Sequence, residues 1–326
     1  MSSWRVGGML VAGALLGLGA AQADEQDQRR VSLITDPRIT EASGMALSTR
    51  VPGLAYVVND SGNDPVVFSV QVSTGEVVGT TTLTGVAPED PEALAIGPDG
   101  RLWVADIGDN TRSRDEVALL ALPQPATGDT SVEPSVHRVR YAGGPADAEA
   151  LVANPGTGRL AIATKGAFGG EVLALPASLP ADGVAVAEPL DVATPGLVTD
   201  GATLPGGTAV VLRTYTDAYV YALPDWRLVG RRPLPQTRQG ETVAAEPDGR
   251  HLLLGSEGTP SPIIRVTLPA DALAALVPAG TGEETGDTAS DPTPPGWVHR
   301  HLEAVAGGAA VAAGLVAVVW WRRWRG

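Results

Sequence analysis

The sequence predicts an all-β fold, a five-bladed β-propeller, on three observations. One short pattern recurs five times, at steps of 41 to 57 residues, and this WD40-like spacing is the range expected for four-stranded blades. Turn residues follow the strands of each copy, and the 40 glycines and 27 prolines of the chain supply them. With 44% hydrophobic residues among 326, the chain has enough apolar side chains for a core.

The recurring pattern is a polar or acidic residue, then a small residue, then a short apolar strand. The five copies lie at 42–47, 91–96, 148–153, 199–204 and 240–245. Turns such as Pro98-Asp99-Gly100 and Pro247-Asp248-Gly249 lead from a copy to its second strand, because these residues favour tight hairpins. Second strands are expected at 54–58, 102–105, 160–163, 209–212 and 251–254.

Further strands complete the blades. Third strands are expected at 66–72, 117–122, 171–175, 218–223 and 263–268, and fourth strands at 76–83, 136–141, 186–192 and 227–234. The fifth copy lacks a fourth strand, and the apolar N-terminal segment 31–34 can supply it and close the ring. A six-bladed ring is the alternative, but it needs a blade that no segment supplies.

Residues 1–23 are typical of a secretory signal peptide. Arg5 precedes the apolar run 6–21, and Ala21-Gln22-Ala23 supplies the small residues of a cleavage site. An uncleaved anchor is the alternative. After cleavage the protein begins at residue 24, and the propeller ectodomain is expected over 24–270.

Residues 302–322 predict a single transmembrane helix. The apolar run 304–321 is about long enough to cross a ~30 Å hydrocarbon layer. Trp320 and Trp321 suit the membrane interface, and the basic tail 323–326 suits the cytoplasm; a helix packed inside the domain is the alternative. The acidic Pro/Thr/Gly segment 271–301 is expected to be a disordered stalk. The prediction is a single-pass cell-membrane protein with its N-terminal domain outside the cell.

Charge and cysteine content exclude several classes of function. A net charge of −14 repels phosphate backbones, so nucleic acid is not an expected partner. The absence of cysteine excludes disulfides, thiolate metal sites and cysteine nucleophiles. A multi-span transporter is excluded because only the two ends are apolar enough to meet a membrane. The expected partner is an extracellular ligand or a cell-envelope protein.

Several local motifs carry a family resemblance. They are Asn-Asp-Ser-Gly at 59–62, Asp-Ile-Gly-Asp-Asn at 106–110, and the two hairpins that begin Pro-Asp-Gly-Arg at 98 and 247. With these motifs the region 31–270 resembles secreted or membrane-anchored propellers of high-GC Gram-positive bacteria, broadly similar to NHL, SMP-30 and esterase-like phytase-type propellers. The resemblance implies the architecture and leaves binding, scaffolding and catalysis open.

The repeat predicts two polar rings on one face of the propeller. The start of each inner strand and the end of the antiparallel second strand lie at the same end of a blade. The inner ring is expected to contain Ser43, Glu92, Glu149, Asp200 and Glu241, and the outer ring Asn59, Asp60, Asp106, Asp109, Lys165, Arg213 and Glu257. From these rings, the residues expected to bind a ligand are Ser43, Asn59, Asp60, Glu149, Lys165, Asp200, Arg213 and Glu241.

Oxygen-rich side chains in this set predict a metal site. Glu92, Asp106, Asp109 and Asn110 are the expected ligands, and Ca²⁺ is the expected ion because it prefers carboxylate and amide oxygens. The alternative is structural, since Asp106, Asp109 and Asn110 can fasten a loop by accepting backbone N–H groups. The loop is not an EF-hand, because it lacks the 12-residue spacing and the terminal Glu.

The composition of the rings favours binding over turnover. The sequence has no Gly-x-Ser-x-Gly motif, and two of its four histidines adjoin the expected membrane helix, so a serine triad and a histidine zinc site are not expected. The predicted function is a membrane-anchored propeller that binds a ligand or partner at an acidic funnel. The alternative is a metal-dependent extracellular hydrolase of the esterase or phosphatase type, and carboxylate-pair glycoside hydrolysis also stays open.

Overall fold

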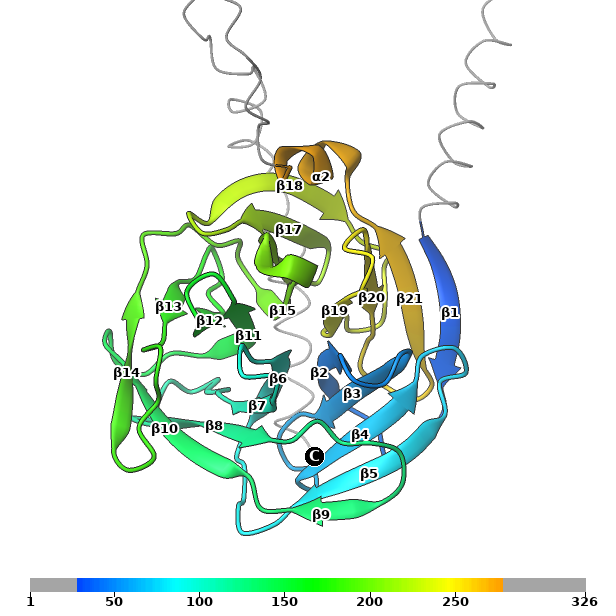
Figure 1. The fold of residues 1–326 in the computed structure, drawn as a ribbon, viewed down its shortest axis with the longest axis horizontal. Helices are drawn as coiled ribbons and strands as arrows, with labels where there is room; N and C mark the ends of the chain where they lie inside the picture. The colour runs from blue at the N-terminus through cyan, green and yellow to red at the C-terminus, as the bar shows by residue number, and fades with distance from the viewer. Residues whose placement is uncertain (1–27, 278–326) are drawn as a thin grey trace, which may run out of the picture. The chain divides into compact units, whose positions relative to one another are not determined.

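A computed structural model describes residues 28–277, and in this range nearly all regular elements are β-strands (Figure 1). The exceptions are a 3-10 turn, η1 (Pro205–Gly207), and one short helix, α2 (Ala270–Ala275). The strands form four hydrogen-bonded sheets. Most strands bury both faces, which explains their nearly continuous apolar sequences.

The first sheet is an antiparallel meander with one added strand. It contains β2 (Ala42–Leu47), β3 (Leu54–Asn59), β4 (Val66–Gln71) and β5 (Val77–Leu83). A distant strand, β9 (Thr130–Val132), pairs in parallel with the outer edge of β5.

The second sheet has eight strands because two antiparallel meanders join at their outer edges. One meander contains β6 (Pro91–Ile96), β7 (Leu102–Asp106), β8 (Val117–Leu122) and β10 (Ser135–Tyr141). The other contains β11 (Ala148–Asn154), β12 (Arg159–Thr164), β13 (Val172–Ala174) and β14 (Val184–Pro189). Parallel pairing of β10 with β14 connects them.

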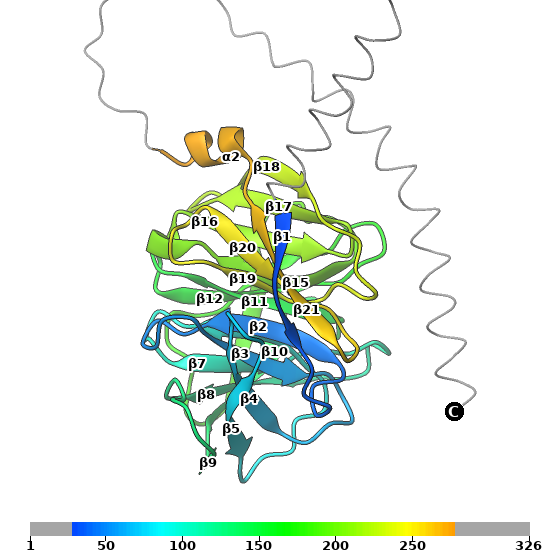
Figure 2. The same ribbon diagram turned by 90° about the vertical axis from the view of Figure 1, so that its right-hand side faces the viewer.

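The remaining two sheets have four strands each. One contains β15 (Val198–Thr203), β16 (Ala209–Thr214), β17 (Asp217–Ala222) and β18 (Arg227–Pro233). The other contains β19 (Val243–Ala245), β20 (His251–Leu254), β21 (Ser261–Thr267) and β1 (Gln28–Ile34). The N-terminal strand β1 pairs antiparallel with β21, and Figures 1 and 2 show the two strands side by side.

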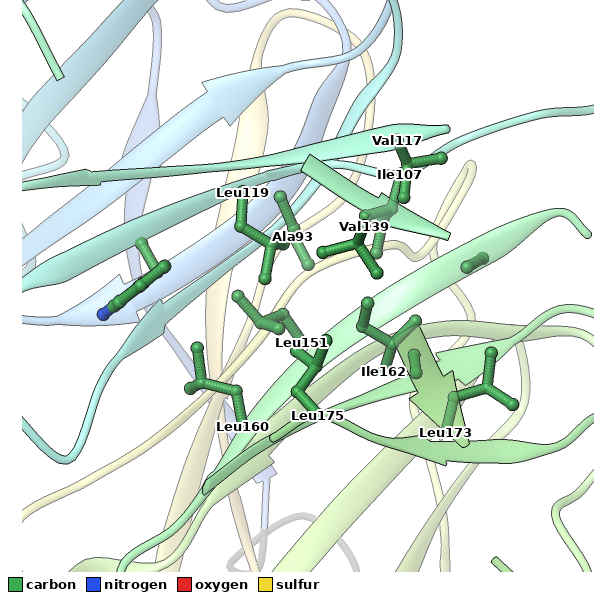
Figure 3. Close-up of a cluster of buried hydrophobic side chains, with 14 of the residues drawn as sticks. Ala93, Ile107, Val117, Leu119, Val139, Leu151, Leu160, Ile162, Leu173 and Leu175 are labelled. Carbon is green, nitrogen blue, oxygen red and sulfur yellow. The ribbon is translucent and has the colours of Figure 1, made fainter. Parts of the chain in front are cut away.

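The inner strands surround a common centre, which gives the propeller arrangement (Figure 1). Around the ring β2 contacts β6, β6 contacts β11, β11 contacts β15, β15 contacts β19, and β19 returns to β2. Apolar side chains fill the space between neighbouring sheets. In Figure 3, Leu119 of β8 faces Leu151 of β11 and Leu175, and burial of such side chains contributes about 25 cal/mol per Å².

The all-β part of the predicted fold class is confirmed, but the prediction fails in two finer respects. The described chain does not divide into five separate four-stranded blades, because β10 and β14 are outer-edge strands close enough to pair and β9 adds to β5. The sheet pairing therefore does not confirm a count of five or of six separate blades. The second respect is the C-terminal helix. The helix that ends the described range, α2, has 6 residues, about 9 Å at 1.5 Å per residue, too short for a membrane.

Within residues 28–277, no helix combines the length and the apolar character needed to cross a membrane. The structure therefore does not support the predicted membrane anchoring through one C-terminal helix, nor the single-pass localisation at the cell membrane that was inferred from it. The predicted span 302–322, its basic tail, the signal peptide 1–23 and the stalk beyond residue 277 lie outside the described residues.

Candidate functional site

A β-bulge recurs at the start of four inner strands. The pairing register shifts between Ala42 and Gly44, Pro91 and Ala93, Ala148 and Ala150, and Val198 and Asp200. A bulge leaves one residue unpaired and re-aims its side chain. The residues at these positions are Ser43, Glu92, Glu149 and Thr199. The repeated pattern of the sequence therefore corresponds to a repeated backbone feature that turns one polar side chain per inner strand.

Glu241 occupies the corresponding place in the last sheet. The backbone N–H groups of Asp60, Lys165 and Glu257 each donate to a carbonyl two residues before Ser43, Glu149 and Glu241, respectively. Glu92, Glu149 and Glu241 are all buried. Burial raises the pKa of Glu92, and the charges of Glu149 and Glu241 raise it further; burial also raises the pKa of Glu149, and the charge of Glu241 adds to that rise. Three of the five predicted inner-ring residues are therefore carboxyl groups that lie close together.

Asp200 is one residue away from the bulge position of its strand. Its side chain is fully buried and accepts the backbone N–H groups of Gly201 at 2.7 Å and Val243 at 2.6 Å. Burial raises the pKa of Asp200, and these N–H groups oppose that rise. At the bulge itself, Thr199 donates to the carbonyl of Gly240 at 3.2 Å. Both side chains connect β15 with the segment around β19.

Arg213, Ser43 and Asn59 also bond to the backbone. Arg213 is fully buried, and its Nη1 donates to the carbonyls of Thr242 and Gly255; burial lowers its pKa to about 10. Ser43 donates to the carbonyl of Pro91 at 2.7 Å, which links β2 to β6. Asn59 donates to the carbonyl of Arg38 at 2.7 Å. These three predicted ligand-binding side chains therefore bond to backbone carbonyls and connect neighbouring segments of the chain.

Lys165 lies among the buried acids. Its Nζ is 2.7 Å from Glu149 Oε1 and 5.7 Å from the centroid of the Tyr215 ring. Burial lowers the pKa of Lys165, but Glu149, Tyr215 and Glu241 outweigh burial and raise it. Tyr215 donates to Glu241 Oε1 at 3.4 Å. A charged and hydrogen-bonded chain therefore connects the third, fourth and fifth repeats.

A second group of carboxylates is less well neutralised. Potential ligand atoms of Asp60, Asp90 and Glu92 all lie within 4.8 Å of one another. Burial, together with Asp60 and Asp147, raises the pKa of Asp90 to about 7. Burial, then the charges of Glu149, Asp60 and Asp90, raise the pKa of Glu92. Asp90 Oδ1 is buried and has no hydrogen-bond partner within residues 28–277.

Gly108 makes room for these carboxylates. A Cβ atom at this position would lie 2.4 Å from Asp90 Oδ2 and 2.6 Å from Glu92 Oε1, which is too close for real contacts. The glycine of the Asp-Ile-Gly-Asp-Asn loop therefore contributes to the site by having no side chain. The motif was singled out for its acidic residues, but it is the glycine of the motif that lies against the carboxylates of Asp90 and Glu92.

The acidic residues of that loop are satisfied by the loop itself. Asp106 Oδ1 accepts the backbone N–H of Asp90 at 2.8 Å and Arg114 Nη1 at 3.0 Å. Asp109 Oδ2 accepts the backbone N–H of Arg114 at 2.7 Å. Asn110 is exposed. Of the four expected metal ligands, Glu92 belongs to the Asp60, Asp90 and Glu92 group, and Asp106 and Asp109 fasten the loop.

Glu257 adds a half-buried acid beside Glu241. Burial, then the charge of Glu241 and a hydrogen bond with it, raise the pKa of Glu257 to about 9. Such a carboxyl group keeps its proton at neutral pH. We call the whole set the acidic cluster; it comprises Asp60, Asp90, Glu92, Glu149, Lys165, Tyr215, Glu241 and Glu257.

A cavity of about 300 Å³ adjoins the acidic cluster at Lys165. Asp147, Lys165 and Tyr141 line it together with the glycine-containing segments 143–146 and 164–171. This volume is at the lower end of the range of small-molecule sites. The cavity therefore borders the acidic cluster at Lys165.

The chain has no match among protein-family models, and no curated protein matches it. It is similar to the solved structure of a gluconolactonase from Xanthomonas campestris, with 17% identity, coverage of 77% of this chain and 93% of that one, and a TM-score of 0.44. A glutaminyl cyclase from Myxococcus xanthus gives 14% identity, 74% and 97% coverage, and a TM-score of 0.46. A glucose dehydrogenase gives 11% identity, 74% and 99% coverage, and a TM-score of 0.43. Similarity at this level does not extend to activity.

Proposed function

We propose that the protein is a ligand-binding propeller whose acidic cluster takes up a divalent cation, Ca²⁺, at Asp60, Asp90 and Glu92. The bound cation, together with Lys165, would then receive a ligand that the protein holds without turning it over. The observation that carries the proposal is the approach of three carboxyl groups to within 4.8 Å, with the buried Asp90 Oδ1 lacking a partner in the described range.

The donor set supports a hard cation. Its three members offer only oxygen atoms, which Ca²⁺ and Mg²⁺ prefer, and Ca²⁺ tolerates irregular geometry better. Like charges at this distance repel, and that repulsion contributes to the raised pKa of Asp90 and Glu92. A divalent ion would reverse this effect by favouring the charged form of each carboxyl group.

The other members of the acidic cluster support a ligand site next to the cation. Lys165 is held by Glu149 and borders the 300 Å³ cavity, so its ammonium group is fixed in orientation before a ligand arrives. Pre-organisation of this kind lowers the entropic cost of binding. The remaining predicted residues support the proposal indirectly, because their side chains bond to backbone groups around the cluster; they are Ser43, Asn59, Asp200 and Arg213.

A metal-dependent hydrolase is the second candidate, and Glu257 is the observation that favours it. A carboxyl group with a pKa of about 9 beside a second carboxyl group, that of Glu241, resembles the carboxyl pairs of hydrolytic sites, in which one member is a proton donor. In this alternative Glu257 would protonate a leaving group, and the cation would polarise the bond that is cleaved.

The two candidates are separated by binding and turnover measured on the same protein. Isothermal titration with Ca²⁺ should give saturable binding that Asp90→Asn abolishes, and this result would support the cation site. Generic ester, phosphate and glycoside substrates, each with and without Ca²⁺, should show no turnover. Turnover that disappears in Glu257→Gln would replace the binding function with the hydrolase.

A further inference from the structure

Two hairpins share the sequence Pro-Asp-Gly-Arg but differ in the residues that flank it. The first, at 98–101, lies between Gly97 and Leu102, and the second, at 247–250, lies between Glu246 and His251. Both hairpins connect an inner strand to its second strand, β6 to β7 and β19 to β20. Only the second hairpin therefore has metal-binding residue types on both sides of the turn.

The three side chains of the second hairpin converge. Potential ligand atoms of Glu246, Asp248 and His251 lie within 4.8 Å of one another. His251 Nδ1 is 2.6 Å from Asp248 Oδ2. The side chains come from the residue after β19, the turn and the first residue of β20, and the backbone hydrogen bond from Glu246 to the carbonyl of His251 fixes their relative positions.

Glu246 provides an independent indication of a ligand. Its residue is 8% exposed, and Oε1 accepts Arg265 Nη2 at 2.5 Å. The other oxygen, Oε2, is buried and has no hydrogen-bond partner among residues 28–277. A buried carboxylate oxygen without a partner is costly. Glu246 lies beside an imidazole and a second carboxylate, so a bound cation would satisfy this oxygen.

We propose that Glu246, Asp248 and His251 bind a divalent transition-metal ion of the Zn²⁺ type. One imidazole nitrogen and two carboxylate groups form a mixed donor set, which suits Zn²⁺ better than Ca²⁺. The metal would replace the proton that His251 Nδ1 shares with Asp248 Oδ2, and Glu246 Oε2 would supply the buried ligand. Water would complete the coordination, since Asp248 is exposed.

This site is separate from the acidic cluster. Glu241 precedes β19 and Glu246 follows it, so the two residues lie at opposite ends of the strand, about 16 Å apart at 3.3 Å per residue. The two sites also differ in donor chemistry, oxygen alone in the acidic cluster and mixed nitrogen and oxygen in the hairpin. The inference therefore does not depend on the proposed function.

The first hairpin is a matched control within the chain. Its aspartate, Asp99, accepts Trp103 Nε1 at 3.1 Å and Arg101 Nε at 2.6 Å. Gly97 stands before the turn, where a Cβ atom would lie 2.3 Å from Trp103 Nε1. The turn aspartate is thus bonded to an indole in the first hairpin and to a histidine in the second.

The test is titration of the untagged full-length chain with Zn²⁺ by calorimetry, and with Co²⁺ followed by visible absorption. The wild type should bind one equivalent that survives Asp90→Asn. His251→Leu, which gives the hairpin the flanking residue of the first one, should weaken binding by about tenfold or more, and Glu246→Gln should also weaken it. His137→Leu should leave it unchanged, because the Nδ1 of this histidine contacts the carbonyl of Pro180.

Each variant must melt cooperatively without metal, which shows that it is folded. Asp248→Asn is a further variant that preserves the turn, and it should also weaken Zn²⁺ binding. Absence of saturable Zn²⁺ binding to the wild type would overturn the proposal. Equal binding by the wild type and His251→Leu would also overturn it, since the metal would then bind elsewhere in the chain. Loss of Zn²⁺ binding in Asp90→Asn with retention in His251→Leu would assign the ion to the acidic cluster instead.

Discussion

Two groups of carboxylates lie next to each other in the structure and differ in what neutralises them. Asp106 and Asp109 receive backbone N–H groups and bonds from the Arg114 segment. Burial raises the pKa of Asp109, but the N–H groups of Ser113 and Arg114, with the Thr111 hydroxyl and the Arg114 charge, more than offset it and lower the pKa. Asp90 and Glu92, in contrast, have raised pKa values and other carboxylates as neighbours.

The difference shows that the number of acidic residues in a motif does not identify a metal site. The hydrogen-bond donors around a carboxylate determine whether it binds a metal or holds a loop. A carboxylate that already accepts several N–H bonds gains little from a cation. The Asp60, Asp90 and Glu92 group has like charges nearby and an oxygen without a partner in the described range. Four substitutions or conditions test this comparison.

The largest effect is expected from Asp106→Ala. The substitution removes the nearest carboxylate partner of Arg114, whose side chain is 13% exposed, and an acceptor for the N–H of Asp90. Breaking a buried ion pair from one side costs about 3 kcal/mol, so the free energy of unfolding should fall by that amount in urea titrations. The loss should be the same with and without Ca²⁺. A loss seen only in Ca²⁺ would make Asp106 a metal ligand.

Calcium should stabilise the wild type through the other group. At a hundredfold excess over Kd the expected gain is about 2.7 kcal/mol, measured as a rise in melting temperature at constant ionic strength. Asp90→Asn should abolish the gain, because it removes the negative charge and replaces one carboxylate oxygen by an amide nitrogen, which cannot bind a cation. NaCl at matched ionic strength is the control, since screening alone acts equally for both salts. Equal shifts of the melting temperature by CaCl₂ and NaCl would contradict the proposed cation site.

Gly108→Ala tests the space between the loop and the carboxylates. The added methyl group would push Asp90 Oδ2 and Glu92 Oε1 away from their positions, at a cost of about 1 to 2 kcal/mol, and should reduce the stabilisation by Ca²⁺. Gly143→Ala is the matched control, because nothing lies within 4 Å of a Cβ atom there. Both quantities are measured by thermal melting with and without Ca²⁺. If both variants respond to Ca²⁺ like the wild type, Gly108 does not border the cation.

Much of the fold follows from the pattern of strands, and the exceptions are informative. Strands such as β2 and β8 have the predicted bounds, since alternating turns and apolar runs are local signals. The pairing of β10 with β14 and of β9 with β5 was missed, because edge pairing depends on how sheets approach one another in space. A pattern along one strand carries no information about that approach.

The site was predictable in part for the same reason. Glu92, Glu149 and Glu241 follow from the repeat, but Asp200 is displaced by one residue because the bulge falls at Thr199. Asp90 was missed, although the repeated Asp-x-Glu at 90–92 and 147–149 is visible in the sequence. Arg114 pairs with Asp106 and Lys165 pairs with Glu149. These pairs decide which acids lack a hydrogen-bond donor, and they depend on the folded structure, so the sequence pattern does not show them.

The smallest effect is the pH dependence that Asp90 confers on the metal-free protein. Its pKa is about 7 in the folded chain against a reference value of 3.8, so folding favours the protonated form. The contribution to stability is complete below about pH 4 and is lost as pH rises through 7. Because Asp90 is partly exposed, solvent screening limits the loss to about 1 kcal/mol. Unfolding free energies from pH 5 to pH 8 should therefore fall more steeply in the wild type than in Asp90→Asn. Saturating Ca²⁺ should remove that difference, because the cation competes with the proton for the same oxygens. Identical slopes for the two proteins would mean that Asp90 is already neutralised by a donor, as Asp106 is by Arg114.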